Sequence, residues 1–447
     1  MTRPTFLEST RRIVPLAWPM WVGQIAVLAF STVDTVMAAR SSALDLAALA
    51  VGGAAYISIF VGLMGVVTAL GPIAGQLYGA GRLHDSGRAL HQAMWLALGL
   101  SVAGCALLVF PQPFLDLAHT PPDVETRVRG YLTALAFALP AALIFAAYRS
   151  FNIAVSRPKA VMALQLGALV LKVPLTALLV FGWTLSTPLG SVSVPAFGAA
   201  GCGISTAIVM LLQMALALAV LRRDPFYVRF GLRERFSPPD RASLVALLRL
   251  GVPMGLSILV EVTGFTFMAF FISRIGPTPV AGHQIAVNMV SLMFMLPLAL
   301  ANASSTLVAQ HIGANDERSA RRVGRHGVEF GMLCGAAVGA AMPLLAWIVV
   351  FHVADATQTV AAFVLRAWRV VNAPLAINAV AIWGVGLGGG YLLAFDSLAP
   401  SPPGLQGAQG FWAAATLGLV VAAVALLTLM AHTYHRQKRA GPIAAPV

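Results

Sequence analysis

Long apolar stretches follow one another along the whole chain, separated by short segments rich in charged residues, proline and glycine. The first runs from residue 13 to 39, and the others lie at residues 46–78, 89–111, 131–148, 160–183, 198–221, 244–273, 280–312, 327–341, 342–365, 374–395 and 410–432. About 20 apolar residues suffice for a helix to cross the hydrocarbon core of a bilayer. The pattern therefore predicts an all-α integral membrane protein with about twelve transmembrane helices.

Two stretches need separate treatment. The first is too long for a cleaved signal peptide and contains Asp34, so we expect it to remain as the first helix. Residues 327–365 must hold two spans and a turn in only 39 positions. We keep two spans there, with a shortened ninth helix, because a single span would place the basic C-terminus on the opposite side of the membrane.

Composition narrows the class of protein further. Of 447 residues, 59% are hydrophobic and only 10% are charged, whereas soluble domains carry about 25% charged residues. This excludes a soluble enzyme or a nucleic-acid-binding domain. The three cysteines lie far apart inside apolar stretches, so we expect neither disulfides nor a metal site, and no cofactor.

The 29 basic residues are distributed unevenly over the predicted connections. The N-terminus and alternate connections hold 24 of them, and these 24 include Arg149 and Arg366. Lys172 lies inside a span. The four on the opposite side are Arg40, Arg127, Arg129 and Arg274. Basic residues accumulate in cytoplasmic loops, so both termini are predicted to be cytoplasmic.

The two halves of the chain resemble each other. A gapless shift of 234 residues superposes Pro19 on Pro253 and residues 76–80 on residues 310–314, with twelve identities over residues 11–90. Two copies of six spans share their orientation, which is a common design of transport proteins with a substrate path between the repeats. We therefore predict two six-helix lobes, at residues 1–221 and 243–447, joined by a cytoplasmic connection at residues 222–242.

Among the charged residues inside apolar stretches we single out Asp34, Glu261, Asp355 and Lys172. A charged side chain at the centre of a membrane helix costs about 2.5–3.5 kcal/mol, so each must be paired, neutralised or hydrated. Asp34 and Lys172 could form a structural ion pair. No buried base is evident for Glu261 and Asp355 in their own half, which favours a role in ion coupling there.

A polar group interrupts the eighth span, with His283, Gln284 and Asn288 within six residues. Such a group is typical of a polar cavity wall, and equally of hydrogen bonds between helices. Both interpretations stay open.

Taken together, these residues resemble the multidrug and toxic compound extrusion (MATE) family, in its NorM-like bacterial branch. The resemblance runs over nearly the whole chain. The segments that carry it are residues 33–38, 76–81, 261, 281–288, 355–358 and 365–366.

The resemblance implies an inner-membrane antiporter, not an enzyme, with two lobes around a central V-shaped cavity. It would export drugs and other bulky, often cationic organic compounds in exchange for H⁺ or Na⁺. The family assigns Asp34 to ion coupling in the N-lobe, and Glu261 with Asp355 to a C-lobe cation site that could hold Na⁺. We expect a monomer in the lipid bilayer, with small organic molecules as its partners and no nucleic acid.

One departure from the family pattern affects the coupling ion. Lys172 stands where relatives often have asparagine, with Thr176 one turn on and Thr206 in the sixth span. A fixed positive charge beside Asp34 would repel Na⁺, so we favour proton coupling there. Thr176, Thr206 and Gln358 are counted as supporting polar residues of the cavity.

Two other functions were considered. A lipid-linked oligosaccharide flippase of the same superfamily would be expected to line its cavity with several basic residues, and only Lys172 is predicted inside a span. An intramembrane enzyme would need a nucleophile and base, or a set of metal ligands, at membrane depth. The histidines are scattered and show no such spacing.

Overall fold

The computed structural model describes residues 5–118, 121–187, 190–234, 236–340, 346–395, 402 and 404–440, most of them in helices. The first half contains α1 (Phe6–Ser41), α2 (Ala43–Val67), α3 (Leu70–Gly79), α4 (Leu83–Val109), α5 (Gln112–Ala118), α6 (Pro122–Ala154), α7 (Pro158–Phe181), β1 (Trp183–Thr187), β2 (Gly190–Val194) and α8 (Ala199–Arg223). A 3₁₀ helix, η1 (Pro225–Phe230), then leads to α9 (Arg241–Ser273), α10 (Pro277–Gly313), α11 (Glu317–Ala340), α12 (Ala346–Ala367), α13 (Asn372–Asn378), the π-helical η2 (Ala379–Gly388), α14 (Gly389–Ala394) and α15 (Ala408–Ala440).

The predicted all-α membrane fold is confirmed. Within the described residues, ten helical segments are long and apolar enough to cross a membrane, with α2 and α3 forming one segment and α13 to α14 another. Helices α11 and α12 are not among these ten segments, and they occupy the places of the predicted ninth and tenth spans. The pair β1–β2 is an antiparallel hairpin between α7 and α8.

The ninth helix is longer than its apolar stretch predicts. Helix α11 begins at Glu317, ten residues before that stretch, and has 24 residues, or about 36 Å of rise. Its first turns carry charged side chains, and ion pairs such as Arg321–Glu317 at 3.5 Å support the helix where no apolar pattern marks it. The turn expected between the two spans falls on residues 341–345, outside the described residues.

Polar caps at the helix starts explain several boundaries. Thr5 and Glu8 form a capping box at the start of α1, and Ser42 accepts a hydrogen bond from the backbone N–H of Asp45 at the start of α2. Asp240 likewise accepts from the N–H of Ser243 at 2.8 Å before α9. Each cap satisfies an N–H group that has no partner within its helix.

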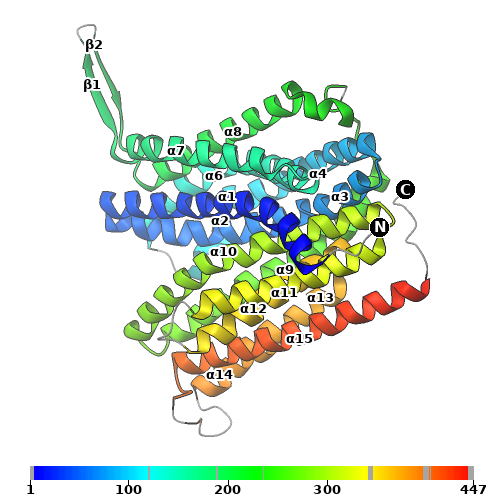
Figure 1. Cartoon of the computed structure of the whole chain (residues 1–447). Helices are drawn as coiled ribbons and strands as arrows, with labels where there is room; N and C mark the ends of the chain where they lie inside the picture. Colours follow the sequence, from blue (N-terminus) through cyan, green and yellow to red (C-terminus); the bar gives the residue numbers. More distant parts are fainter. Residues whose placement is uncertain are drawn as a thin grey trace.

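Each half is built around one enclosed helix, and Figure 1 shows the first half above the second. Helix α6 packs against α2, α4 and α8, and 67% of its most apolar window is buried, the largest share of the ten candidate spans. In the second half, α12 packs against α10, α11 and α15. These are the fourth and tenth spans, which hold equivalent places in the two repeats.

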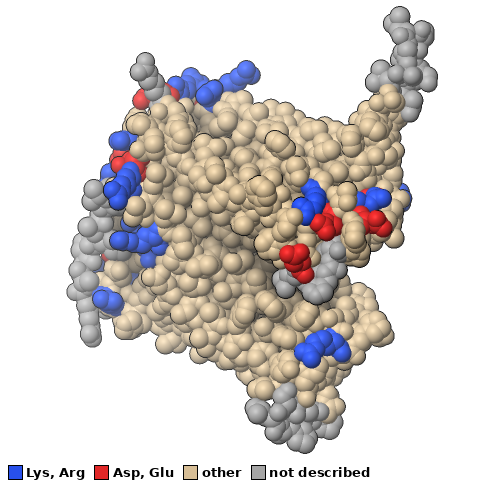
Figure 2. Space-filling model, turned by 180° about the vertical axis from the view of Figure 1, so that it is seen from behind, with Lys and Arg blue, Asp and Glu red and all other residues tan. Residues whose placement is uncertain are grey.

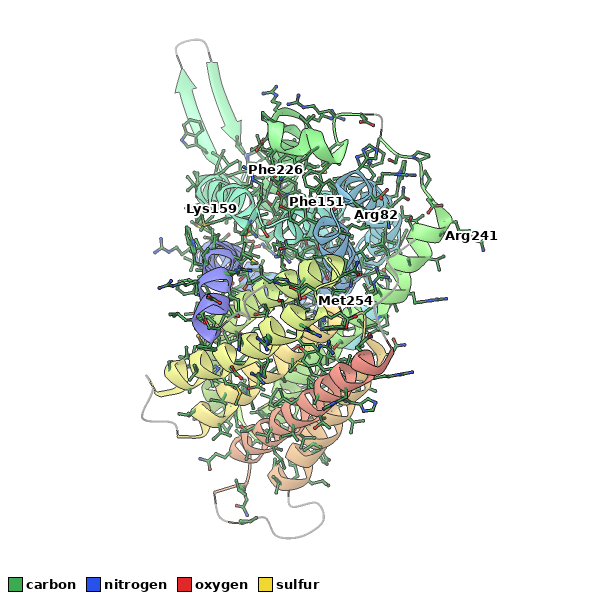
Figure 3. The ribbon with its side chains drawn as sticks, turned by 45° about the vertical axis from the view of Figure 1, so that its right-hand side comes forward. Arg82, Phe151, Lys159, Phe226, Arg241 and Met254 are labelled. Carbon is green, nitrogen blue, oxygen red and sulfur yellow. The ribbon has the colours of Figure 1, made fainter. Side chains whose placement is uncertain are left out.

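The two ends of the bundle differ in charge. One end, which we call the basic end, carries the chain's first described residues, the end of α15 and most of the Lys and Arg side chains (Figures 1 and 2). Arg82 and Arg241 lie there in Figure 3. The opposite end, which we call the hairpin end, carries β1–β2.

The halves meet mainly at the basic end, where α1 and α3 pack against α10 and α2 packs against α9. Ile13 and Ala17 of α1 pack on Ala299 and Ala303 of α10. Gly65 of α2 crosses α9 so closely that a Cβ there would overlap the backbone of Gly255.

Toward the hairpin end, the hydrophobic clusters of the described residues stay within one half. Phe30 of α1 packs with Ala168 and Val209 of the first half, and Val290 of α10 packs with Phe351 of the second. Figure 2 shows the surface hollowed between the two halves. The halves therefore converge at the basic end and separate toward the hairpin end.

The connection after α8 is fastened to the first half. Gln92 of α4 donates to the carbonyl of Pro238 at 2.7 Å and accepts from the N–H of Asp240 at 2.8 Å. At the start of the connection, the N–H of Phe226 and the Arg157 guanidinium hold the pKa of Asp224 below its usual value. The second half is thus attached to the first at a fixed point just before α9.

Candidate functional site

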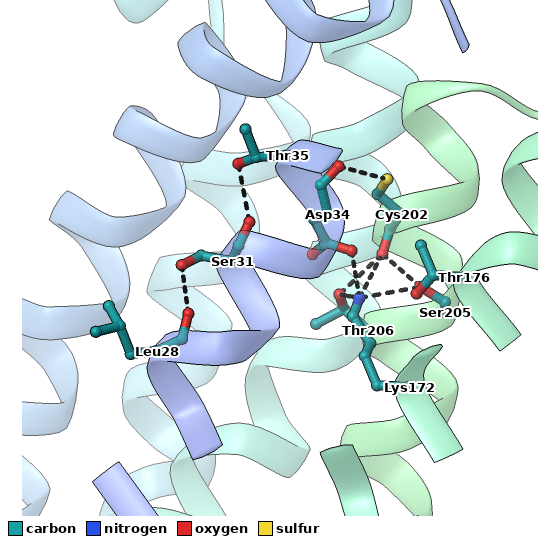
Figure 4. Close-up of polar contacts among 9 residues, drawn as sticks. All are labelled: Leu28, Ser31, Asp34, Thr35, Lys172, Thr176, Cys202, Ser205 and Thr206. Carbon is teal, nitrogen blue, oxygen red and sulfur yellow. Dashed lines mark hydrogen bonds and ion pairs between the residues drawn. The ribbon is translucent and has the colours of Figure 1, made fainter. Parts of the chain in front are cut away.

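The first candidate centre is a buried ion pair between α1 and α7. The Nζ atom of Lys172 lies 2.7 Å from Oδ1 of Asp34, and the Lys172 side chain is fully buried (Figure 4). The apolar sequence on either side of both residues forms helices that pack together, which brings the two charges inside the first half. The geometry matches the ion pair that the sequence left open as a structural interpretation.

Lys172 is also held by three oxygen atoms of α8. Its ammonium donates to Oγ1 of Thr206 at 2.6 Å, to Oγ of Ser205 at 3.0 Å and to the carbonyl of Cys202 at 3.3 Å. Thr176 reaches the same group through a 2.8 Å hydrogen bond with Ser205. The predicted Thr176 and Thr206 therefore join this centre, which we call the lysine cage: Lys172, Thr176, Cys202, Ser205 and Thr206.

The sequence missed Ser205 and the Cys202 carbonyl. A backbone carbonyl gives no signal in a sequence, and a Ser-Thr pair in an apolar helix usually bonds only to its own helix. Ser205 and Thr206 do bond back to the Cys202 carbonyl, at 2.9 and 2.8 Å. Only the packing of α7 against α8 adds the ammonium to this local arrangement.

The second candidate centre lies in the second half, around α9 and α12. Asp355 is buried, and its Oδ1 accepts a 3.3 Å hydrogen bond from Gln358 one turn on. Glu261 of α9 lies close enough to Asp355 for the two carboxyl groups to interact electrostatically. No carboxylate of this centre has an ion-pair partner within 4 Å among the described residues, unlike Asp34.

Arg366 corrects one part of the sequence analysis. From the sequence we assigned both Arg366 and Arg149 to connections, and we therefore found no buried base near Glu261. The structure has Arg149 within α6 and Arg366 within α12. Arg366 is buried, stacks 4.1 Å over Phe363 and is near enough to Glu261 for the two charges to interact. Side chains on a helix lean toward its N-terminus, so an arginine in the last turn of α12 reaches back into the bundle.

Amide oxygens in this centre lack donors. Asn378 of α13 donates to Ser257, one turn before Glu261, at 3.2 Å, while its own Oδ1 has no partner. The Oε1 atom of Gln358 is also buried without a partner. Carboxyl groups and amide oxygens are the ligand types that hard cations prefer, and both occur in this part of the second half.

The predicted polar group on α10 does not stay together. His283 is buried, with its ring 5.7 Å from that of Trp412 and its Nδ1 without a partner. Gln284 and Asn288 are exposed and make no described hydrogen bond to another helix. They lie four residues apart and so share a face of α10 that differs from that of His283.

The structure thus divides the predicted residues between two separate centres. Asp34, Lys172, Thr176 and Thr206 lie within the first half, whereas Glu261, Asp355 and Gln358 lie within the second. Their roles in ion coupling stay predictions. Within the described residues, no cluster of three or more His, Cys, Asp or Glu side chains is placed to hold a metal ion.

The MatE family model matches residues 19–178 and 253–346. The two matches begin 234 residues apart, which is the shift that superposes the two halves of the sequence. The chain is 38% identical over 435 residues to the probable multidrug resistance protein NorM of Aromatoleum aromaticum, and the aligned region covers 92% of each chain. It is 30% identical over 443 residues to multidrug resistance protein NorM of Vibrio cholerae, covering 94% of this chain and 95% of that one.

Solved structures show the same fold. A eukaryotic MATE transporter, AtDTX14, superposes with a TM-score of 0.81 at 19% identity and covers 96% of this chain and 98% of its own. The outward-facing conformation of a multidrug resistance MATE family transporter gives 0.82 at 18% identity, with 97% of each chain covered. Together with the NorM relatives, these matches show that the chain belongs to the MatE family.

Proposed function

We propose that this protein is an ion-coupled antiporter that exports drugs or other bulky, often cationic organic compounds across the bacterial inner membrane. The observation that carries the proposal is the ion pair between Asp34 and Lys172, in which the lysine is held independently of the acid. Its NorM relatives bear names of multidrug resistance proteins. The function is transport and not enzymatic catalysis.

The lysine cage supports a proton cycle. When Asp34 takes up a proton, Lys172 loses its ionic partner but keeps its hydrogen bonds to Thr206, Ser205 and the Cys202 carbonyl. The ammonium therefore stays in place, and the change is confined to α1, which is released from α7 and α8. Because α1 also packs against α10 of the other half, this release couples the charge of Asp34 to the position of the two halves.

The second centre supports a cation that the first does not. The carboxyl groups of Glu261 and Asp355, with the free oxygens of Gln358 and Asn378, would offer hard ligands to Na⁺. Among the described residues no base lies within ion-pair distance of either acid, and Arg366 acts on Glu261 only at longer range. We therefore assign proton coupling to Asp34 and a Na⁺-competent site to the second half. Na⁺ is here a transported ion, and we propose no resident cofactor.

The hollow between the halves is the proposed substrate path. Gln284 and Asn288 are exposed on α10 near its hairpin end. Exposed, unpaired amides are costly in hydrocarbon, which favours their facing water in this hollow. Lys172 is tied to Asp34 inside its own half, so it offers no free charge to a pyrophosphate group, and a flippase is disfavoured.

The distribution of charge supports an orientation. Most of the basic side chains lie at one end of the bundle, together with the described ends of the chain (Figures 1 and 2). Basic connections stay in the cytoplasm, so the basic end faces the cytoplasm and the hollow opens to the periplasm. Both halves of the path lie in one chain, and we propose that the monomer is sufficient.

The test is efflux of a fluorescent organic cation from proteoliposomes under an imposed pH gradient and, separately, a Na⁺ gradient. We expect the pH gradient to drive efflux in the wild type and not in Asp34→Asn. The variant Lys172→Asn should shift the dependence toward Na⁺, because it removes the positive charge beside Asp34. No efflux of any cation under either gradient would overturn the proposal.

Asp45→Asn is the matched control for these variants. Asp45 is a second buried aspartate of the first half, paired with Arg127 at 2.6 Å, and it lies outside the lysine cage. If this variant loses pH-driven efflux as completely as Asp34→Asn, the loss reflects any buried ion pair and not the role of Asp34.

A further inference from the structure

The basic end contains a contact that the two halves make reciprocally. A Cβ on Gly79 of α3 would overlap the carbonyl of Gln310 on α10, and a Cβ on Gly313 of α10 would overlap the carbonyl of Gln76 on α3. The shift of 234 residues that relates the halves makes Gly79 equivalent to Gly313 and Gln76 equivalent to Gln310. The two contacts are therefore copies of each other. The two glycines allow the backbones of α3 and α10 to cross at close range.

The same two glutamines reach across the crossing with their side chains. Gln76 donates to the carbonyl of Ala367, the last residue of α12, at 2.8 Å. Gln310 donates to the carbonyl of Ala154, the last residue of α6, at 2.8 Å, and to Oγ of Ser156 at 2.9 Å. Each half therefore supplies a donor to the equivalent helix of the other.

The two acceptors are equivalent in detail. After α6, Ser156 has a φ of 61°, and after α12, Arg369 has a φ of 60°. In both turns, the three backbone N–H groups that follow the last helical residue donate to carbonyls that lie before that residue. The carbonyls of Ala154 and Ala367 are left over at the two helix ends, where an acceptor needs a partner from outside the helix.

We propose that Gln76 and Gln310 are gating residues, and that their reciprocal caps on α12 and α6 form the closed gate at the basic end of the transporter. Each cap is intact only while the halves touch at this end. Opening this end breaks both caps together, because both are formed where α3 crosses α10. This inference rests on the proposed transport function and specifies how its closed state is held.

The surroundings of the gate suit a contact that is broken and remade. A hollow of about 470 Å³ at this end is lined by Tyr78, Gly79 and Gln310, so water reaches the crossing and can replace the lost partners. The net contribution of a hydrogen bond that is exchanged with water is modest, which keeps the two states close in energy. Gln76 is buried and Gln310 is half-buried, so the Gln76 cap is the harder of the two to replace.

The test compares Gln76→Met, Gln310→Met and the double variant, since methionine keeps the size of glutamine and removes its donor. Spin labels at Lys159→Cys and Arg318→Cys, in a background without the three native cysteines, report the separation of the halves at the basic end. Each single variant should raise the population with a long distance about fivefold, and the double about 25-fold, since a bond of this kind shifts an equilibrium by roughly that factor. Unchanged distances in the double variant would overturn the proposal.

Gln213→Met is the matched control, because Gln213 is as buried as Gln76 but lies on α8, which packs only against elements of the first half among the described contacts. It should leave the distance distribution unchanged, and a shift as large as that of Gln76→Met would also overturn the proposal. These distances need no substrate or ion gradient. A protein that opens and closes but transports nothing would contradict the proposed function and leave the gate intact.

A second measurement holds the gate shut and does not depend on the stability of the methionine variants. Ser156→Cys and Gln310→Cys place two thiols where a short, reducible thiol cross-linker can join the halves. Cross-linking should abolish efflux, and reduction should restore it to the level of the same double variant before cross-linking. Full efflux in the cross-linked protein would show that this contact does not open during transport.

Discussion

The two halves bury acids in different surroundings, although they derive from one repeated design. In the first half, Asp34 has a lysine at 2.7 Å, and the ammonium also donates to three oxygen atoms of α8. In the second half, Glu261 and Asp355 have no direct ion pair among the described residues, and nearby amide oxygens lack donors. The first centre is electrically satisfied as it stands, whereas the second has ligands to spare.

We infer from this difference that the two halves divide two tasks. An acid that is already paired with a lysine is sensitive to protonation, because a protonated carboxyl group no longer forms the ion pair. Oxygen atoms without hydrogen-bond donors can instead coordinate a cation. Arg366 interacts electrostatically with Glu261, and we propose that it opposes a cation at the second centre.

Neutralising the acids is the strongest way to break the comparison. Asp34→Asn, Glu261→Gln and Asp355→Asn should each reduce efflux of a fluorescent cation to that of protein-free vesicles. Na⁺ binding, measured by the Na⁺-dependent rise in melting temperature, should persist in Asp34→Asn and disappear in the other two. Wild-type efflux by all three variants would show that the acids are structural.

Removing the lysine is the next largest test. Lys172→Met leaves Asp34 buried without its partner, and breaking a buried pair from one side costs about 3–5 kcal/mol of unfolding free energy. The double variant Lys172→Met with Asp34→Asn should recover most of that loss, because neither charge remains. Denaturant unfolding of the four proteins in detergent measures the coupling. Equal losses in the single and double variants would mean that the two charges do not depend on each other.

Much of this comparison could be predicted from the sequence. Asp34 and Lys172 stand out as opposite charges in apolar stretches, and the repeat is visible in the positions of Gln76 and Gln310. The partners of Lys172 could not be predicted, because a carbonyl and a serine on α8 become ligands only when α8 packs against α7. Local pattern thus identified the charges but not the oxygens that hold them.

Two errors share one physical origin. The apolar pattern ends where a helix leaves hydrocarbon, but the helix itself continues. Helix α11 therefore begins at Glu317, ahead of its apolar stretch, and Arg366 belongs to α12 and not to the connection after it. Hydropathy locates the membrane-embedded part of a helix, while charged residues at its ends can still point back into the protein.

Arg366→Met sharpens the comparison from the side of the second half. Without this guanidinium, the attraction of Glu261 and Asp355 for a cation is no longer opposed, so the affinity for Na⁺ should rise roughly three- to tenfold. The measurement is the Na⁺ concentration that gives half of the maximal rise in melting temperature. Arg325→Met is the control, since Arg325 pairs with Glu329 on the exposed side of α11. A fall in Na⁺ affinity would mean that Arg366 organises the ligands and does not oppose the ion.

The smallest expected effects come from the oxygens of the lysine cage, and they test whether Lys172 is held independently of Asp34. Thr206→Val removes its 2.6 Å acceptor and Ser205→Ala its 3.0 Å acceptor, and each should cost about 1 kcal/mol of unfolding free energy. Thr176→Val touches the ammonium only through Ser205 and should cost less. Against a Lys172→Met background these costs should shrink, because the oxygens then have no ammonium to hold. Costs that stay the same in that background would assign the hydroxyls to packing between α7 and α8, and Asp34 alone would then keep the lysine in place.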